Sequence, residues 1–265
     1  MLTLARLRDQ CVARPSLRLP TRDVLGVQNG PAYQHDLFKS PQKYRYGCAG
    51  LTADLMGGRP FAFMGNKWPG IDMLLKIDPC IFQVRCNYPV FLPSTATPGP
   101  RVYRAREPIL SIVDRMLTVE LKARPGRAHL HALFLRESAL IKATAWLERF
   151  DVSVEKISLE QFSPLAIRNA AQCYQWLLGG DIRAWATEAE WFAAALLRTQ
   201  STRRAQTIPL DARMAQMAEK LHCDLNHAYR LLGTAIAYGF VEIERGARLH
   251  IHRPLHLVID ERESL

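Results

Sequence analysis

The sequence predicts an α/β protein, in which one part forms a mixed sheet flanked by helices and a second part is mainly helical. Residues 46–180 alternate short apolar or β-branched runs with segments of helical periodicity, in the order strand, strand, helix, strand, helix. This order is typical of three-layered α/β folds. After Gly179-Gly180 the pattern changes to helices followed by a β-hairpin. We therefore expect an extension over residues 1–45, an α/β domain over 46–180 and a separate domain over 181–265.

The composition is that of a soluble globular protein with a basic amino-terminal part. The chain has 265 residues, of which 48% are hydrophobic and 23% charged, and its net charge is +10. Residues 181–265 hold 11 basic and 11 acidic residues, whereas residues 1–180 hold 24 and 14. Such an excess suits a polyanionic partner, of which nucleic acid is the common one. A basic surface that only aids solubility is the alternative.

No apolar run reaches 18 residues, and residues 1–9 lack the apolar core of a signal peptide. The six cysteines are scattered without a Cys-x-x-Cys pair, which favours free thiols in a reducing compartment over a zinc site. We therefore expect a cytoplasmic protein that has no membrane contact.

The first elements follow from local signals. Residues 1–45 contain four prolines and many basic residues without a periodic pattern, so we expect an irregular extension there. Six glycines in residues 46–70 predict turns between short strands. Apolar residues from 71 to 77 predict a short helix that ends at Asp78-Pro79, and a strand is predicted over residues 81–85.

The centre of the α/β domain is a predicted hairpin, with strands at residues 109–113 and 117–122 and a turn near Asp114-Arg115. Because side chains alternate along a strand, Glu120 and Lys122 should point to the same side. A buried carboxylate and ammonium are costly unless they pair or take part in chemistry. Metal-dependent phosphodiester cleavage uses such a pair, in which the acid binds the cation and the lysine orients the attacking water. A salt bridge at the strand edge explains the pair equally well.

Two helices and a strand complete this domain. Apolar residues at spacings of three and four predict a helix over residues 132–150. A short strand follows over residues 152–157, and Pro164 begins a helix that extends to about residue 178.

Residues 181–265 are predicted to form a winged helix-turn-helix domain. The expected elements are helices over 186–199, 210–221 and 225–238, and a hairpin of 240–244 with 248–251. On the last helix, Asn226, His227 and Arg230 are the side chains able to reach DNA bases or phosphates. Because this domain is electrically neutral, protein docking competes with DNA binding as its role.

In their order and spacing, these features resemble the TnsA-type endonuclease subunit of heteromeric transposases. The resemblance covers about residues 65–252 and is most specific where a hydrophobic helix is followed by Asp78-Pro79, a strand and the run Arg85-Cys86-Asn87-Tyr88-Pro89. It implies a restriction-endonuclease-like domain of the PD-(D/E)-x-K class followed by a winged helix domain. It also implies a role in DNA transposition, with DNA, a transposase and an ATP-dependent regulator as partners.

The resemblance assigns the catalytic acid and lysine to Glu120 and Lys122. The family's metal-binding aspartate lies about 15 residues before the lysine, where this chain has Glu107, whose extra methylene shifts the ligand oxygens. The family's helix glutamate should lie near Trp68, where no acid is present. Asp72 is the substitute metal ligand on that helix, with an ordinary helix charge as the alternative. The implied cofactor is Mg²⁺ or Mn²⁺, held by Glu107, Glu120 and Asp72.

Further charged residues and histidines are candidates for contacts with DNA or a metal. Arg124 and Arg127 follow the predicted catalytic strand, where they would contact DNA phosphates unless they are ordinary loop charges. Asp114 is another candidate acid, but it lies at the predicted hairpin turn. The His-x-His pairs at residues 129–131 and 250–252 have a spacing that metals use, yet without a third ligand they favour packed or solvated histidines.

Three functional hypotheses follow. The first is a divalent-metal-dependent endonuclease that cuts DNA at transposon ends. The second is a catalytically degenerate assembly and DNA-binding factor of the same transposition complex, which the missing helix glutamate favours. The third is a winged-helix transcription regulator, which the neutral charge of residues 181–265 disfavours.

Overall fold

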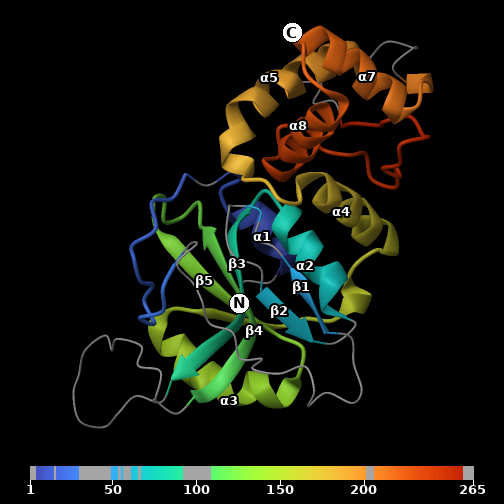
Figure 1. The fold of residues 1–265 in the computed structure, drawn as a ribbon. Helices are drawn as coiled ribbons and strands as arrows, with labels where there is room; N and C mark the ends of the chain where they lie inside the picture. Colours follow the sequence, from blue (N-terminus) through green and yellow to red (C-terminus); the bar gives the residue numbers. More distant parts are fainter. Residues whose placement is uncertain are drawn as a thin grey trace. The chain divides into compact units, whose positions relative to one another are not determined.

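The computed structural model shows an α/β chain that divides into two units (Figure 1). Unit 1 comprises residues 1–54, 58–72 and 80–161, and unit 2 comprises residues 55–57, 73–79 and 162–265. The structure describes residues 4–14, 16–29, 49–52, 55, 61–64, 67–91, 109–200 and 206–258. In these ranges no helix has both the length and the apolar character needed to span a bilayer.

Unit 1 contains a four-stranded mixed sheet. Its strands are β3 (Ile81–Phe91), β4 (Ile109–Glu120), β5 (Ala128–Phe134) and β6 (Ser153–Lys156). They lie in the order β3-β4-β5-β6, with β6 parallel to β5 and the other neighbours antiparallel. β4 is therefore hydrogen-bonded on both sides, and its residues 115–120 are all buried. A separate two-stranded sheet pairs β1 (Ala49–Thr52) with β2 (Phe61–Met64).

The prediction of a hairpin within residues 109–122 is wrong, because β4 runs without a turn through Asp114 and Arg115. Arg115 pairs with Cys86 of β3 on one side and with Leu133 of β5 on the other. Two adjacent charged residues are typical of a turn, which is why the sequence predicts one at Asp114-Arg115. In the fold, Asp72 neutralises the charge of Arg115, so that the strand can continue. The hairpin forms one strand later, between β4 and β5.

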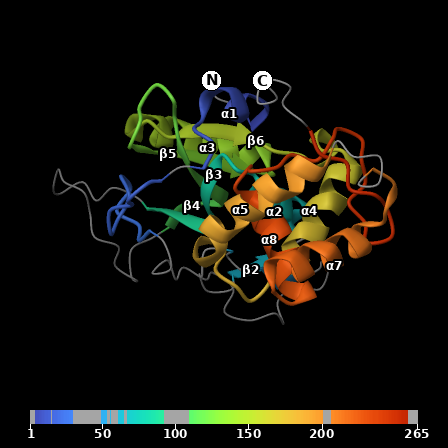
Figure 2. The same cartoon turned by 90° about the horizontal axis from the view of Figure 1, so that it is seen from above.

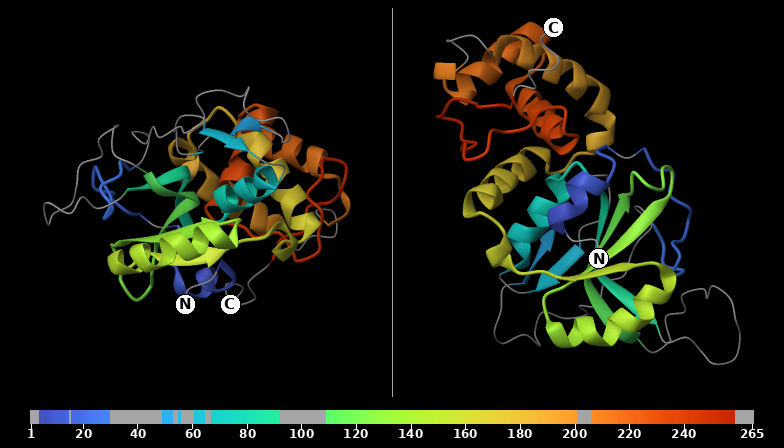
Figure 3. Two further views of the ribbon diagram at one scale, coloured as in Figure 1. Left: turned by 90° about the horizontal axis from the view of Figure 1, so that it is seen from below. Right: turned by 180° about the vertical axis from the view of Figure 1, so that it is seen from behind.

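The helices of unit 1 are α1 (Leu4–Gln10), the first half of α2 (Trp68–Ile77), and α3 (Glu137–Leu147), which continues as the 3-10 turn η3 (Glu148–Phe150). A second 3-10 turn, η4 (Leu159–Gln161), follows β6. Figure 3 shows α3, in yellow-green, packed against the sheet. The predicted start of this helix at residue 132 is corrected to 137, because β5 uses the apolar residues up to Phe134.

Residues 4–29 differ from the expected extension, because they contribute to the core of unit 1. Leu7, Cys11 and Val27 are buried. Cys11 forms a β-bridge with Leu121, just beyond the end of β4. The sequence gives no sign of this, because the partners are more than 100 residues apart.

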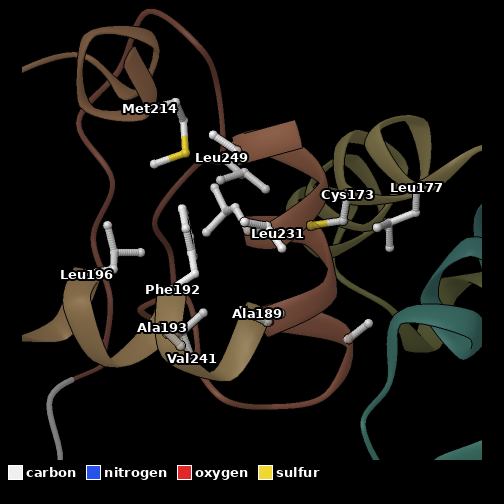
Figure 4. Packing of buried hydrophobic residues seen from close by; sticks show 14 of the residues in the cluster. Cys173, Leu177, Ala189, Phe192, Ala193, Leu196, Met214, Leu231, Val241 and Leu249 are labelled. Carbon is white, nitrogen blue, oxygen red and sulfur yellow. The ribbon is translucent and has the colours of Figure 1, made fainter. Parts of the chain in front are cut away.

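Unit 2 is built around α4 (Pro164–Leu177), α5 (Ile182–Gln200), α7 (Leu210–Leu221) and α8 (Leu225–Ala237). Three of the four agree with the prediction to within a residue, because local caps set their ends. The Ser163 side chain caps α4, the Asp224 side chain caps α8, and Gly239 follows α8 with a φ of 66°. Figure 4 shows Phe192, Leu196, Met214, Leu231 and Leu249 meeting in the core of this unit.

The predicted hairpin between residues 240–244 and 248–251 is wrong. The segment around Ile243 pairs instead with residues 256–258, through an Ile243–Leu257 bridge and two backbone hydrogen bonds. Residues 248–253 run along the helices, since the Leu249 N–H donates to the Asn169 side chain of α4. The buried Leu249 explains this path, because it enters the core rather than a strand.

Candidate functional site

Glu120 is the last residue of β4, and its side chain is buried. Its Oε1 accepts a hydrogen bond from the Gly126 backbone N–H at 2.7 Å. Gly126 has a φ of 73°, a conformation that favours glycine. The Glu120 carboxylate therefore stabilises the turn between β4 and β5 by accepting a hydrogen bond from its backbone.

Lys122 lies two residues beyond β4, where the chain pairs with the last residue of α1 and the residues that follow it. The Lys122 N–H donates to the Gln10 carbonyl and the Val12 N–H donates to the Glu120 carbonyl, both at 2.8 Å. The Lys122 Nζ donates to the Asp9 carbonyl at 3.0 Å. Because Asp9 lies in the last turn of α1, the ammonium caps the negative end of this helix.

Asp72 is buried on α2, and Arg115 of β4 binds both of its oxygens. Arg115 Nε donates to Oδ1 at 2.5 Å and Nη2 donates to Oδ2 at 2.8 Å. The guanidinium also lies over the Trp68 ring, 3.9 Å from its centroid. Burial alone lowers the pKa of Arg115, but the charge of Asp72 and its hydrogen bonds help to hold that pKa above the ordinary value. The pair is therefore a neutralised, stacked ion pair inside unit 1.

The structure does not bring the Asp72 site and Glu120 together. Arg115 and Glu120 are five residues apart on β4, which corresponds to roughly 17 Å along the strand. Because five is an odd number, their side chains point to opposite faces of the sheet. Glu107, the third predicted metal ligand, lies outside the described residues. Among the residues that are described, no three His, Cys, Asp or Glu side chains form a group that could hold a metal ion.

Two histidines of β5 hydrogen-bond to the neighbouring strand β6. His129 Nε2 is 2.8 Å from Ser153 Oγ, and burial lowers the pKa of His129. His131 is fully buried, with its Nε2 3.1 Å from Glu155 Oε2. Glu155 also accepts a hydrogen bond from the Leu4 N–H at 2.7 Å, so this carboxylate joins α1 to the sheet. These contacts agree with packed histidines.

Unit 1 contains a second buried ion pair, which joins β3 to the amino-terminal segment. Arg85 Nη1 lies 2.6 Å from Asp23 Oδ2, and the Tyr88 hydroxyl donates to the same oxygen at 2.8 Å. Both side chains from β3 belong to the run on which the family resemblance rests. Their acid partner lies more than 60 residues earlier, in a segment whose sequence pattern gave no structural signal.

Asp114 holds the segment that leads into α3. Its Oδ2 accepts a hydrogen bond from the Leu135 N–H at 2.8 Å. Burial raises the pKa of Asp114, although this hydrogen bond and the nearby charges of Arg115 and Arg136 oppose the rise.

The connection between β4 and β5 carries the exposed side chains of Arg124 and Arg127. Arg124 forms an ion pair with Asp151. Arg127 is exposed at the end of the turn, where its N–H donates to the Arg124 carbonyl. Both guanidinium groups are thus accessible from solvent.

In unit 2, the three predicted DNA-contacting residues of α8 have different surroundings. His227 Nε2 lies 2.9 Å from Glu188 Oε2 of α5, and Arg230 lies over the Trp185 ring at 5.5 Å. Both side chains are therefore held against α5. Asn226 is exposed in the first turn of α8.

Comparison with known proteins adds no identification, because no family model and no curated protein sequence matches this chain.

Proposed function

We propose that this chain is a DNA-binding and assembly subunit of a transposition complex, with a nuclease-like domain whose acidic groups have become structural. The link to transposition comes from the resemblance to TnsA-type subunits. The loss of DNA cutting is inferred from one observation. Each candidate metal ligand and the candidate catalytic lysine in the described residues is bound to another group of the protein. The Gly126 N–H donates to the Glu120 carboxylate, and the Lys122 ammonium donates to the Asp9 backbone carbonyl. Arg115 donates to the Asp72 carboxylate.

The Asp72 contact is the most costly of these to replace. A metal ion at Asp72 would have to displace Arg115, which would then lie buried without its carboxylate. Breaking a buried ion pair by removing one partner costs about 3–5 kcal/mol. Mg²⁺ also keeps several waters and needs near-ideal octahedral geometry, which a carboxylate held by a two-pronged guanidinium does not offer.

The order of elements supports the two finer fold assignments within this proposal. α2, β3, β4, β5, α3 and β6 follow one another around a mixed sheet, as a restriction-endonuclease-like domain requires. In unit 2, α7 and α8 are joined by a short turn at residues 222–224, as in a helix-turn-helix. In this proposal, the short pairing of residues 242–244 with 256–258 would serve as the wing.

The charge distribution supports separate roles for the two parts. The excess of basic residues lies in residues 1–180, which favours this part for DNA. Residues 181–265 are neutral, and His227 and Arg230 are bound to α5, which favours docking of the transposase or the ATP-dependent regulator.

Cutting by a Mg²⁺- or Mn²⁺-dependent site is the second candidate, and one observation favours it. Glu120 ends the interior strand β4, and Lys122 follows two residues later, next to the exposed Arg124 and Arg127, so that bound DNA would pass near the carboxylate. In this case Glu107 would complete the site.

Cutting of transposon-end DNA by the assembled complex, with Mg²⁺ or Mn²⁺, separates the two candidates. The test protein is the Glu107→Gln/Glu120→Gln variant, because glutamine keeps the acceptor for the Gly126 N–H. The matched control is Glu148→Gln/Glu190→Gln, which removes two exposed carboxylates. We expect equal cutting and equal transposition by all three proteins. Loss of cutting by the test variant alone would establish the nuclease instead.

A further inference from the structure

Two segments that are far apart in the sequence lie side by side in unit 1. The backbone of residues 10–12 pairs with that of residues 120–122 through the Cys11–Leu121 bridge and two hydrogen bonds. The Lys122 Nζ adds a third connection to Asp9. Figure 2 shows α1 and the connection between β4 and β5 at one edge of this unit.

This pairing gathers basic side chains from both segments. We call the surface that they form the N-terminal basic surface; it consists of Arg8, Arg14, Lys122, Arg124 and Arg127, all of them exposed. Residues 121–127 contain three bases and no acid, and residues 4–14 contain three bases and one acid. Asp151 offsets a further charge through Arg124. Together with Asp151, the two segments contain six basic and two acidic residues.

We infer that the N-terminal basic surface binds the phosphate backbone of duplex DNA. This inference rests on the proposed function and names the part of the chain that contacts the DNA. Four of the five side chains are arginines, whose planar fork matches two phosphate oxygens. The supporting backbone is fixed by the Glu120–Gly126 hydrogen bond and by the paired strand ends, so that the charges are held in place before DNA arrives.

The surroundings favour nucleic acid over an acidic protein as the partner. Protein interfaces have an apolar core, whereas DNA interfaces are polar and strongly positive. Of the large hydrophobic side chains that are exposed in the described part of unit 1, namely Val24, Ile112, Ile141 and Phe150, none belongs to residues 4–14 or 121–127. The surface thus offers charge without an apolar centre.

The test is binding of the full chain to a fluorescent duplex of random sequence, measured by anisotropy over a series of salt concentrations. The first variant is Arg8→Gln/Arg14→Gln, and the second is Arg124→Gln/Arg127→Gln. The matched control is Arg168→Gln/Arg198→Gln, which removes two exposed charges from unit 2. Circular dichroism establishes that each protein is folded, and the second variant serves as the test if the first does not fold.

Each phosphate contact contributes about 0.9 to the slope of log K against log salt. Each test variant should therefore lose about two units of slope and up to roughly 60-fold in affinity at 0.1 M salt. The control should bind like the parent protein.

Equal weakening of the control would overturn the inference, since net charge alone would then explain binding. So would unchanged binding by both test variants. Competition by poly-glutamate as effective as competition by unlabelled duplex would identify an acidic protein as the partner instead. A parent protein that does not bind duplex at all would refute the proposed function itself, which distinguishes the two failures.

Discussion

The buried pair between Asp72 and Arg115 gives the sharpest prediction, because the two candidate functions assign Asp72 different roles. If Asp72 is structural, replacing it with alanine leaves the Arg115 charge buried without a partner. We expect Asp72→Ala to lower the free energy of unfolding of unit 1 by about 3–5 kcal/mol, and Arg115→Met to do the same. A metal ligand, by contrast, can be removed with little loss of stability in the metal-free protein.

The double variant provides the internal check. Asp72→Ala/Arg115→Met removes both charges of this pair and leaves neither of them buried alone, so its loss should be far smaller than the sum of the two single losses. Methionine also keeps an apolar stem against the Trp68 ring, which limits the loss of packing. We therefore expect the double variant to lie within about 2 kcal/mol of the parent protein.

The assay has to report on unit 1 alone, because the chain contains two units. Hydrogen exchange of peptides from β4, followed by mass spectrometry, meets this need. A loss of about 4 kcal/mol should accelerate the slowest exchanging amides roughly a thousandfold. Single losses below about 1 kcal/mol, or losses that add up in the double variant, would refute the structural role of the pair.

Three further predictions concern packing, pH and cysteine reactivity. Gly180→Ala should destabilise unit 2 by about 1–3 kcal/mol, because the added Cβ would lie 1.9 Å from the nearest atom of the Trp185 ring. A urea titration measures the loss, and a variant as stable as the parent protein would contradict this close approach. Since burial raises the pKa of Asp114, the folded state binds this proton more tightly than the unfolded state, and the contribution of Asp114 to stability is lost as the pH rises above about 3.8. Asp114→Asn, in which the amide oxygen can accept the same hydrogen bond, should make stability fall less steeply with pH in this range. A steeper fall in the variant would contradict a raised pKa of Asp114. Burial raises the pKa of Cys173 to about 12, so iodoacetamide at pH 8 should modify the partly exposed Cys223 long before Cys173. Mass spectrometry of labelled peptides measures the order of modification, and faster labelling of Cys173 would contradict this prediction.

The elements that the sequence predicts well are those whose limits are set by nearby residues. α7 has the predicted bounds because its apolar spacing and the short turn after it are local features. α4 and α8 have caps within two or three residues of their ends. The strand β6 also lies within its predicted range.

The errors arise where a side chain has a partner that is distant in the sequence. Arg115 reads as a turn residue until Asp72, on another element, neutralises it within β4. The hydrogen bond from Gly126 to Glu120 spans only six residues, but from the sequence Glu120 is expected to bind a metal ion or to pair with Lys122 instead. The contact of Lys122 with Asp9 joins residues 113 apart, and the sequence contains no pattern that predicts it.

The position of α1 has a consequence for the order in which unit 1 is built. Leu4 donates its N–H to Glu155, 151 residues later in the chain, and residues 10–12 pair with the end of β4. During synthesis these amino-terminal residues emerge well before their partners at the end of β4 and on β6. Contacts of such long sequence separation slow folding, because a large loop must close before they contribute. The pairing of residues 10–12 therefore has to wait until residue 122 has been made, and the hydrogen bond from Leu4 until Glu155 has been made.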